Sequence, residues 1–166
     1  LLAEVGYEEI GMDHFSLRTD SLFKAMEHGS LHRNFMGYTA SKTRVMVGLG
    51  ISSIGDSWDS FAQNVKSLEE YHHLVESKII PIYRGHILSE EDRVLRRHIL
   101  NLMCKFNTSW ENQKERFNEL DEAMDKLKEM AHDGLVEMVS NGIYVTEKGR
   151  PFVRNVCMAF DLFLHR

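Results

Sequence analysis

Chemically capable side chains gather in the nonapeptide HRNFMGYTA, which begins at position 32. Arg33 and Asn34 can hold carboxylates or other polar edges of a ligand. Phe35 and Tyr38 offer flat apolar faces, and Gly37 lets a backbone approach closely. This mixture predicts a surface that contacts a small molecule.

A second segment, VMVGLGISSIGDS, begins at position 45 and has a different character. Its small residues leave room beside a strand end: Gly48, Gly50, Ser52 and Ser53. Ile54 supplies an apolar floor. Together the two segments predict one wall of a site for a flat, partly charged small molecule.

The other reactive residue types give weaker candidates. Asp13 and His14 follow a predicted strand, where such a pair either orients a general base or fixes the loop by a hydrogen bond, and the sequence leaves both open. The histidine pairs at 28/32 and 72/73 predict no metal site, because a glycine separates the first pair and adjacent side chains diverge on a helix. Cys104 and Cys157 lie in apolar helical patterns, which favours buried, reduced thiols. We assign no catalytic residue and no metal ligand.

Composition limits the class of protein. The 166 residues are 43% hydrophobic with a net charge of −5, which indicates a globular chain without a basic surface for nucleic acid. No apolar run approaches the roughly 20 residues of a membrane span, and no signal peptide is recognisable, so we expect a cytoplasmic protein without membrane contact. The chain starts at Leu1 without an initiator methionine, and we expect a piece of something longer.

The elements that position the first two segments lie before residue 86. The pattern predicts a strand running into a loop over YEEIGMDHFS, a short helix capped by Asp20 and Gly29, and a buried strand at VMVGLGIS. A helix is predicted over residues 61–77. This strand, loop and helix order suggests α/β architecture.

The pattern changes after residue 87. Ser89 to Asp92 form a capping-box-like helix start, and apolar residues then recur at helical spacing up to Phe106. Two more helices are predicted at residues 109–117 and 118–132, a hairpin around Asn141-Gly142, and a closing helix with Pro151 in its first turn. Three helices, a hairpin and a closing helix predict a winged-helix-like domain. The fold class is therefore α+β, mostly helical.

A winged helix usually suggests DNA binding, which the charge of the third helix disfavours. Residues 118–132 carry five acidic side chains against two lysines, so this helix would be repelled by phosphates. A structural or protein-contact module fits better.

Several blocks of the sequence resemble a known family. The blocks, in chain order, are GYEEIGMDHFS, LHRNFMGYTA, GLGISSIGDS with FAQN, SEEDRVLRRHILNLMCKF and GLVEMVSNGIYVTEKGRPFVRNVCMAFD. They resemble the oxygen-independent coproporphyrinogen III oxidases, radical-SAM enzymes of heme synthesis, along nearly the whole chain.

The resemblance implies a protein larger than this chain. The family builds an incomplete β/α barrel around a four-iron cluster and S-adenosylmethionine, and a largely helical C-terminal domain covers the open end of the barrel. Residues 1–86 would be the last part of the barrel and residues 87–166 the C-terminal domain. The cluster ligands lie in a C-x3-C-x2-C motif, and this sequence has no such motif, so we expect the fragment to be inactive and to bind no cofactor.

Three site residues are carried over by resemblance. Phe35 and Met36 fall where the family contacts a second S-adenosylmethionine, and Ile54 matches an apolar contact there. Met36 departs from the pattern, since the family usually has Gln and a thioether cannot hydrogen bond as an amide does.

The implied reaction is the oxidative decarboxylation of two propionates of coproporphyrinogen III to give protoporphyrinogen IX, through a radical on each propionate. The alternatives are a radical-SAM heme-handling relative without this activity and a winged-helix regulator. Val45, Val47, Leu49 and Ile51 are predicted to be buried in the full-length protein, so their exposure in the fragment predicts self-association.

Overall fold

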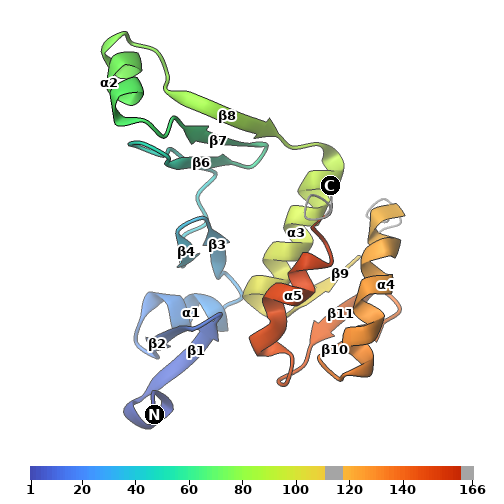
Figure 1. The fold of residues 1–166 in the computed structure, drawn as a ribbon. Coiled ribbons are helices and arrows are strands. Elements are labelled where there is room, and N and C mark those ends of the chain that lie inside the picture. The colour runs from blue at the N-terminus through green and yellow to red at the C-terminus, as the bar shows by residue number, and fades with distance from the viewer. Residues whose placement is uncertain (111–117, 162–166) are drawn as a thin grey trace. The chain divides into compact units, whose positions relative to one another are not determined.

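The computed structural model describes residues 1–110 and 118–161, which contain both helices and strands along their length. The fold is mixed α and β, as the expected α+β class requires, but helices do not make up most of it as expected. The chain divides into two compact units (Figure 1). We call residues 1–42 with 94–166 the paired unit, and residues 43–93 the middle unit.

The paired unit opens with two hairpins and a helix. Its elements are η1 (Ala3–Val5), β1 (Tyr7–Gly11), β2 (His14–Leu17), α1 (Ser21–Glu27), β3 (His32–Asn34) and β4 (Gly37–Thr39). The predicted loop after β1 is instead the second strand of a hairpin, because Met12 and Asp13 both adopt positive φ and form a tight turn. The predicted cap of α1 is confirmed, since the Asp20 carboxylate accepts the Leu22 N–H at 2.7 Å.

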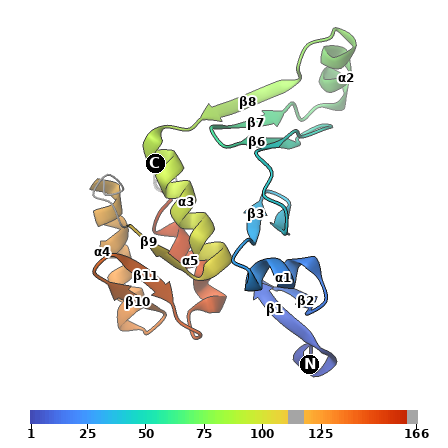
Figure 2. The same cartoon turned by 180° about the vertical axis from the view of Figure 1, so that it is seen from behind.

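The C-terminal part of the paired unit follows the predicted order, with an additional short strand after the first helix and a shorter closing helix. Its elements are α3 (Glu90–Lys105), β9 (Asn107–Ser109), α4 (Asn118–His132), β10 (Val136–Val139), β11 (Gly142–Val145), η3 (Arg150–Phe152) and α5 (Val153–Met158). The strands form an antiparallel sheet in the order β10-β11-β9, seen from both sides in Figures 1 and 2. Nearly all of the helix predicted at 109–117 lies outside the described residues.

The hairpin at Asn141-Gly142 is confirmed, but the glycine has another role than the one predicted. The turn residues are Ser140 and Asn141, and Gly142 is the first residue of β11. A Cβ at Gly142 would lie 2.5 Å from the Thr108 carbonyl oxygen. Glycine therefore allows β9 to approach rather than shaping the turn.

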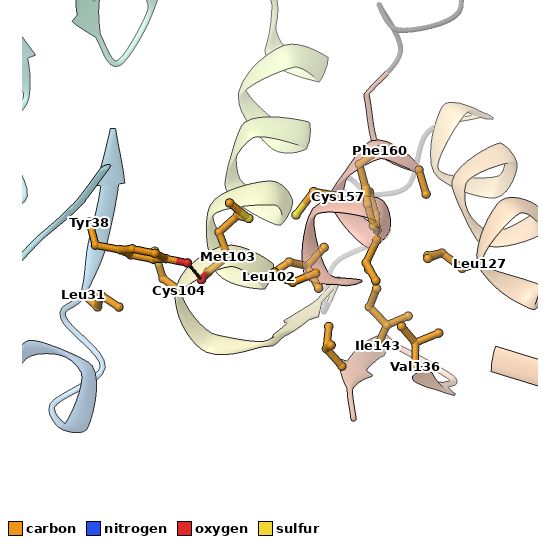
Figure 3. Close-up of a cluster of buried hydrophobic side chains, with 14 of the residues drawn as sticks. Leu31, Tyr38, Leu102, Met103, Cys104, Leu127, Val136, Ile143, Cys157 and Phe160 are labelled. Atoms are coloured by element: carbon orange, nitrogen blue, oxygen red, sulfur yellow. Dashed lines mark hydrogen bonds between the residues drawn. The ribbon is translucent and has the colours of Figure 1, made fainter. Parts of the chain in front are cut away.

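One continuous hydrophobic cluster holds the paired unit together. It joins Tyr38 of the N-terminal hairpins to Leu102 of α3, Leu127 of α4 and Phe160 after α5 (Figure 3). Ile10 of β1 belongs to the same cluster. Residues far apart in sequence therefore share one core.

The middle unit is a four-stranded antiparallel sheet with one helix. Its elements are β5 (Val45–Met46), β6 (Ile54–Ser57), β7 (Ser60–Asn64), α2 (Leu68–Glu76) and β8 (Ile82–Ile87), with strand order β5-β6-β7-β8. The helix predicted from residue 61 starts only at Leu68, after the N-cap Ser67. The predicted α/β order was wrong here, because every strand pairing among the described residues of this unit is antiparallel.

Candidate functional site

The β3–β4 hairpin presents two of the expected site residues at its tip. Phe35 and Met36 form the two-residue turn between Asn34 and Gly37, and their side chains are 53% and 86% exposed. The Asn34 side-chain oxygen accepts a hydrogen bond from the Met36 N–H at 2.8 Å. Gly37 adopts a φ of +124°, a conformation in which a residue with a side chain would be strained. The structure therefore places an aromatic face and a thioether side by side on the surface of the paired unit.

Tyr38 anchors this hairpin in the core. Its hydroxyl donates to the Met103 carbonyl at 2.8 Å, one of the carbonyls that the last turn of α3 leaves without a helical partner (Figure 3). Burial raises the pKa of Tyr38 to about 12, although the nearby Arg33 charge works in the opposite direction. The Tyr38 ring is 9% exposed, so it supports the turn from behind instead of offering a flat face to a ligand.

The approach of Tyr38 depends on a glycine in the neighbouring hairpin. A Cβ at Gly11 would lie 2.7 Å from the Tyr38 hydroxyl oxygen. Gly11 also adopts a φ of +143°, which side chains disfavour. Phe106, with a φ of 58°, ends α3 three residues after Met103. The ends of β1, β4 and α3 therefore meet around one hydroxyl group.

His14 and Arg33 flank the Tyr38 ring. The His14 ring meets it edge-on with centroids 5.1 Å apart, and the Arg33 guanidinium carbon lies 4.7 Å from its centroid. His14 Nδ1 lies 2.9 Å from the Met12 carbonyl oxygen. The loop-fixing alternative therefore describes His14, with the backbone rather than Asp13 as its partner.

The glycine-containing segment is organised by a residue that the sequence analysis missed. The Asn64 side-chain amide donates to the carbonyls of Gly48 and Gly50 at 3.1 and 2.9 Å and contacts Ser53 Oγ at 3.1 Å. The Gly50 N–H donates to the Tyr71 hydroxyl at 3.1 Å. These bonds tie positions 48–53 into a fixed loop, and Gly48 also lines an open cavity. The sequence SLEE contains a signal for this arrangement, because Ser67 and Glu70 indicate that a helix begins there. Asn64 precedes that helix start and therefore belongs to the strand before it.

Ile54, the third carried-over site residue, begins β6 in the middle unit and is half-buried. The middle unit also contains an open cavity of about 460 Å³. Its lining is mainly apolar and includes Val47, Leu49, Ala62 and Ile80. Such a surface suits packing against apolar groups.

The thiols of this chain do not fit an iron–sulfur cluster. Cys104 and Cys157 lie in different helices, both buried. Burial raises the pKa of Cys104 to about 11 and that of Cys157 to about 12, so both are protonated thiols at neutral pH. The predicted buried, reduced thiols are confirmed. Within residues 1–110 and 118–161, no three metal-binding side chains converge, and no helix has the length and apolar content to cross a membrane.

Known proteins resemble this chain along nearly its whole length. Residues 88–152 match the HemN C-terminal domain. The oxygen-independent coproporphyrinogen III oxidase of Escherichia coli K12 is 37% identical over 99% of this chain and 37% of its own length. The protein of that name from Pseudomonas aeruginosa is 38% identical over 98% of this chain and 36% of its own length. The chain thus spans little more than a third of these relatives.

A solved structure shows that the similarity extends to the fold. Coproporphyrinogen III oxidase (HemN) from Escherichia coli, described as a radical SAM enzyme, matches with a TM-score of 0.89 and 38% identity. The match covers 98% of this chain and 38% of that one. By both sequence and fold, the chain is therefore similar to one part of the oxygen-independent coproporphyrinogen III oxidases, and residues 88–152 are similar to the HemN C-terminal domain.

Proposed function

We propose that the full-length protein containing this chain is an oxygen-independent coproporphyrinogen III oxidase. It would oxidatively decarboxylate two propionates of coproporphyrinogen III to give protoporphyrinogen IX. The observation that carries this proposal is 37% identity to the Escherichia coli enzyme sustained over 99% of the chain.

The proposal includes S-adenosylmethionine and a 4Fe-4S cluster as cofactors, since the HemN structure is that of a radical SAM enzyme. The cluster ligands belong to the part of the protein outside this chain. Phe35, Met36 and Ile54 are proposed to contact a second S-adenosylmethionine. The exposure of the Phe35–Met36 turn supports this role.

A finer description of the fold is proposed with this function. The order α3, β9, α4 and the hairpin β10–β11, with β9 as third strand, supports a winged-helix-like C-terminal domain. A sequence division near residue 86 is supported by the start of the family match at residue 88, whereas the compact units divide after residues 42 and 93. The assignment of residues 1–86 to a β/α barrel rests on the similarity to HemN, and any parallel strand partner would come from outside this chain.

Partners and location follow from the same proposal. The porphyrinogen is the substrate, and the acidic sequence of α4 disfavours nucleic acid. We propose a cytoplasmic protein without membrane contact. The exposed apolar side chains of the middle unit support self-association when this chain is isolated.

Anaerobic turnover of the full-length protein tests the function. We expect coproporphyrinogen III to be converted to protoporphyrinogen IX only when S-adenosylmethionine and a reductant are present, as measured by chromatography of the oxidised porphyrins. Omission of S-adenosylmethionine is the control. Unchanged coproporphyrinogen III together with tight heme binding would favour the heme-handling relative instead.

A further inference from the structure

Arg33 is a cation for which the described part of the chain supplies no counter-charge. Its Nη1 is shielded from solvent and has no hydrogen-bond partner among residues 1–110 and 118–161, where it also forms no ion pair. Arg18 and Arg93, by contrast, pair with Glu8 and Asp59 at 2.6 and 2.9 Å. A guanidinium that has lost water on one side without gaining an acceptor is in an unfavourable state.

The orientation of this guanidinium is nevertheless fixed. It lies over the Tyr38 ring, and that ring is held by the bond to Met103 and by the edge of His14. Arg33 as a whole is only half-buried, although its Nη1 is shielded. A stacked arginine with unused donors is pre-organised for a planar acceptor such as a carboxylate.

The other polar groups of the hairpin are already used. The Asn34 oxygen holds the turn, and the Tyr38 hydroxyl holds α3. Arg33 is thus the charged group in β3 that remains available close to the exposed turn of Phe35 and Met36. The position fits a ligand that lies on the turn and carries a negative charge at one edge.

We propose that Arg33 binds a carboxylate of the small molecule that contacts the Phe35–Met36 turn. The inference rests on the proposed function, in which both small molecules, S-adenosylmethionine and coproporphyrinogen III, carry carboxylates. Arg33 supplies two N–H donors to the carboxylate oxygens, and the Tyr38 ring keeps the guanidinium in plane with them. The turn contributes the apolar contact.

The experiment compares ligands with and without the carboxylate on the full-length protein and its Arg33→Gln variant. One arm uses S-adenosylmethionine and decarboxylated S-adenosylmethionine, and the other uses coproporphyrin III and its methyl ester. In the arm whose carboxylate Arg33 binds, we expect Arg33→Gln to lower the affinity for the ligand with the free carboxylate about tenfold to hundredfold. The affinity for the carboxylate-free ligand should fall less than about twofold. Arg33→Lys should recover part of the loss, because it keeps the charge without the planar fork.

Arg154→Gln is the matched control, since Arg154 lies exposed on α5 and its removal changes the net charge equally. Equal losses for the acid and the carboxylate-free ligand, or no loss in either arm, would overturn the role of Arg33. Wild-type protein that binds but does not turn over coproporphyrinogen III would contradict the proposed function alone. Wild-type protein that binds neither ligand would overturn both.

Discussion

The two units differ in how completely they cover their own apolar side chains. The continuous hydrophobic cluster takes every member from the paired unit and none from residues 43–93. In the middle unit, only Val65 and Leu88 are buried large apolar residues, whereas many others are exposed. The exposed set includes Val47, Leu49, Ile80 and Ile82.

Local hydrogen bonding does not explain this difference, because the middle unit is well bonded. Its four strands are paired, and Asn64 alone ties three groups of the neighbouring loop. What it lacks is a second layer over the apolar face of its sheet, and a sheet needs such a layer to bury its side chains. The paired unit has this layer in α3, α4 and α5. The comparison thus separates a unit with its own core from a sheet whose apolar side chains remain largely exposed.

The largest expected effect comes from emptying the core of the paired unit. Phe160 is 0% exposed, and Phe160→Ala should lower the free energy of unfolding of this unit by about 3–5 kcal/mol. Urea denaturation followed by Trp110 fluorescence in a Trp58→Phe background measures it, because each unit contains one tryptophan.

Val75→Ala in the middle unit is the control for this comparison. Val75 is exposed, so its truncation should change stability by less than about 0.5 kcal/mol. Similar losses for both variants would show that the two units do not differ in burial.

The sequence predicts the regions that rely on local signals. The helix α3 begins with the expected capping box, α1 with its expected Asp20 cap, and α4 is followed by Gly134 in a left-handed conformation, as predicted. The apolar period of α3 also identifies its buried side, including Leu95 and Leu102. Such features depend on residues within a few positions of each other.

Features that depend on distant partners were not predictable in the same way. The strand β7 was taken for part of a helix, since FAQN acquires its strand conformation by pairing with β6 and β8. The turn of Met12 and Asp13 lacks the usual glycine of a tight hairpin. Likewise, no local pattern shows that Tyr38 bonds to Met103, 65 positions away. The turn of Phe35 and Met36 could therefore be located from the sequence, but its anchor could not.

A second, smaller effect tests that anchor. Gly11→Ala should destabilise the paired unit by about 2 kcal/mol, because the new Cβ strains the backbone and displaces the Tyr38 hydroxyl from Met103. Hydrogen exchange at the Met36 amide should also become faster as the paired unit loses stability. Gly6→Ala is the control, since Gly6 also has positive φ but open space around its Cβ position. An equal loss for Gly6→Ala would assign the whole effect to backbone strain.

A third prediction concerns the uncovered sheet. The isolated chain should self-associate through the middle unit, and Ile80→Asp should weaken that association at least about tenfold, since a charge at an apolar contact costs more than 1 kcal/mol. Light scattering across a dilution series measures it. Val5→Asp, an equal change at an exposed apolar side chain of the paired unit, should have little effect. A wild-type chain that stays monomeric at high concentration would contradict self-association through the middle unit.

The smallest expected effect lies at the end of the middle unit, where α3 begins. The Asp92 carboxylate accepts the Ser89 N–H at 2.9 Å, and Ser89 Oγ accepts the Asp92 N–H at 3.1 Å. Burial, the largest single influence, tends to raise the pKa of Asp92, but the hydrogen bonds from Ser89 and His86 together lower it. Because the folded-state pKa lies below that of the unfolded chain, the stabilisation is present above about pH 4 and is lost as the pH falls through the folded-state value.

Asp92→Ala should therefore lower the free energy of unfolding by about 0.5–1 kcal/mol at pH 7. The difference from wild type should shrink as the pH falls below about 4, where wild-type Asp92 becomes protonated. Urea denaturation of the middle unit, followed by Trp58 in a Trp110→Phe background, provides the measurement at each pH. Glu91→Ala is the control, because Glu91 lies in the same first turn of α3 but is exposed to solvent. A pH-independent difference for Asp92→Ala would mean that its carboxylate charge does not stabilise this helix start.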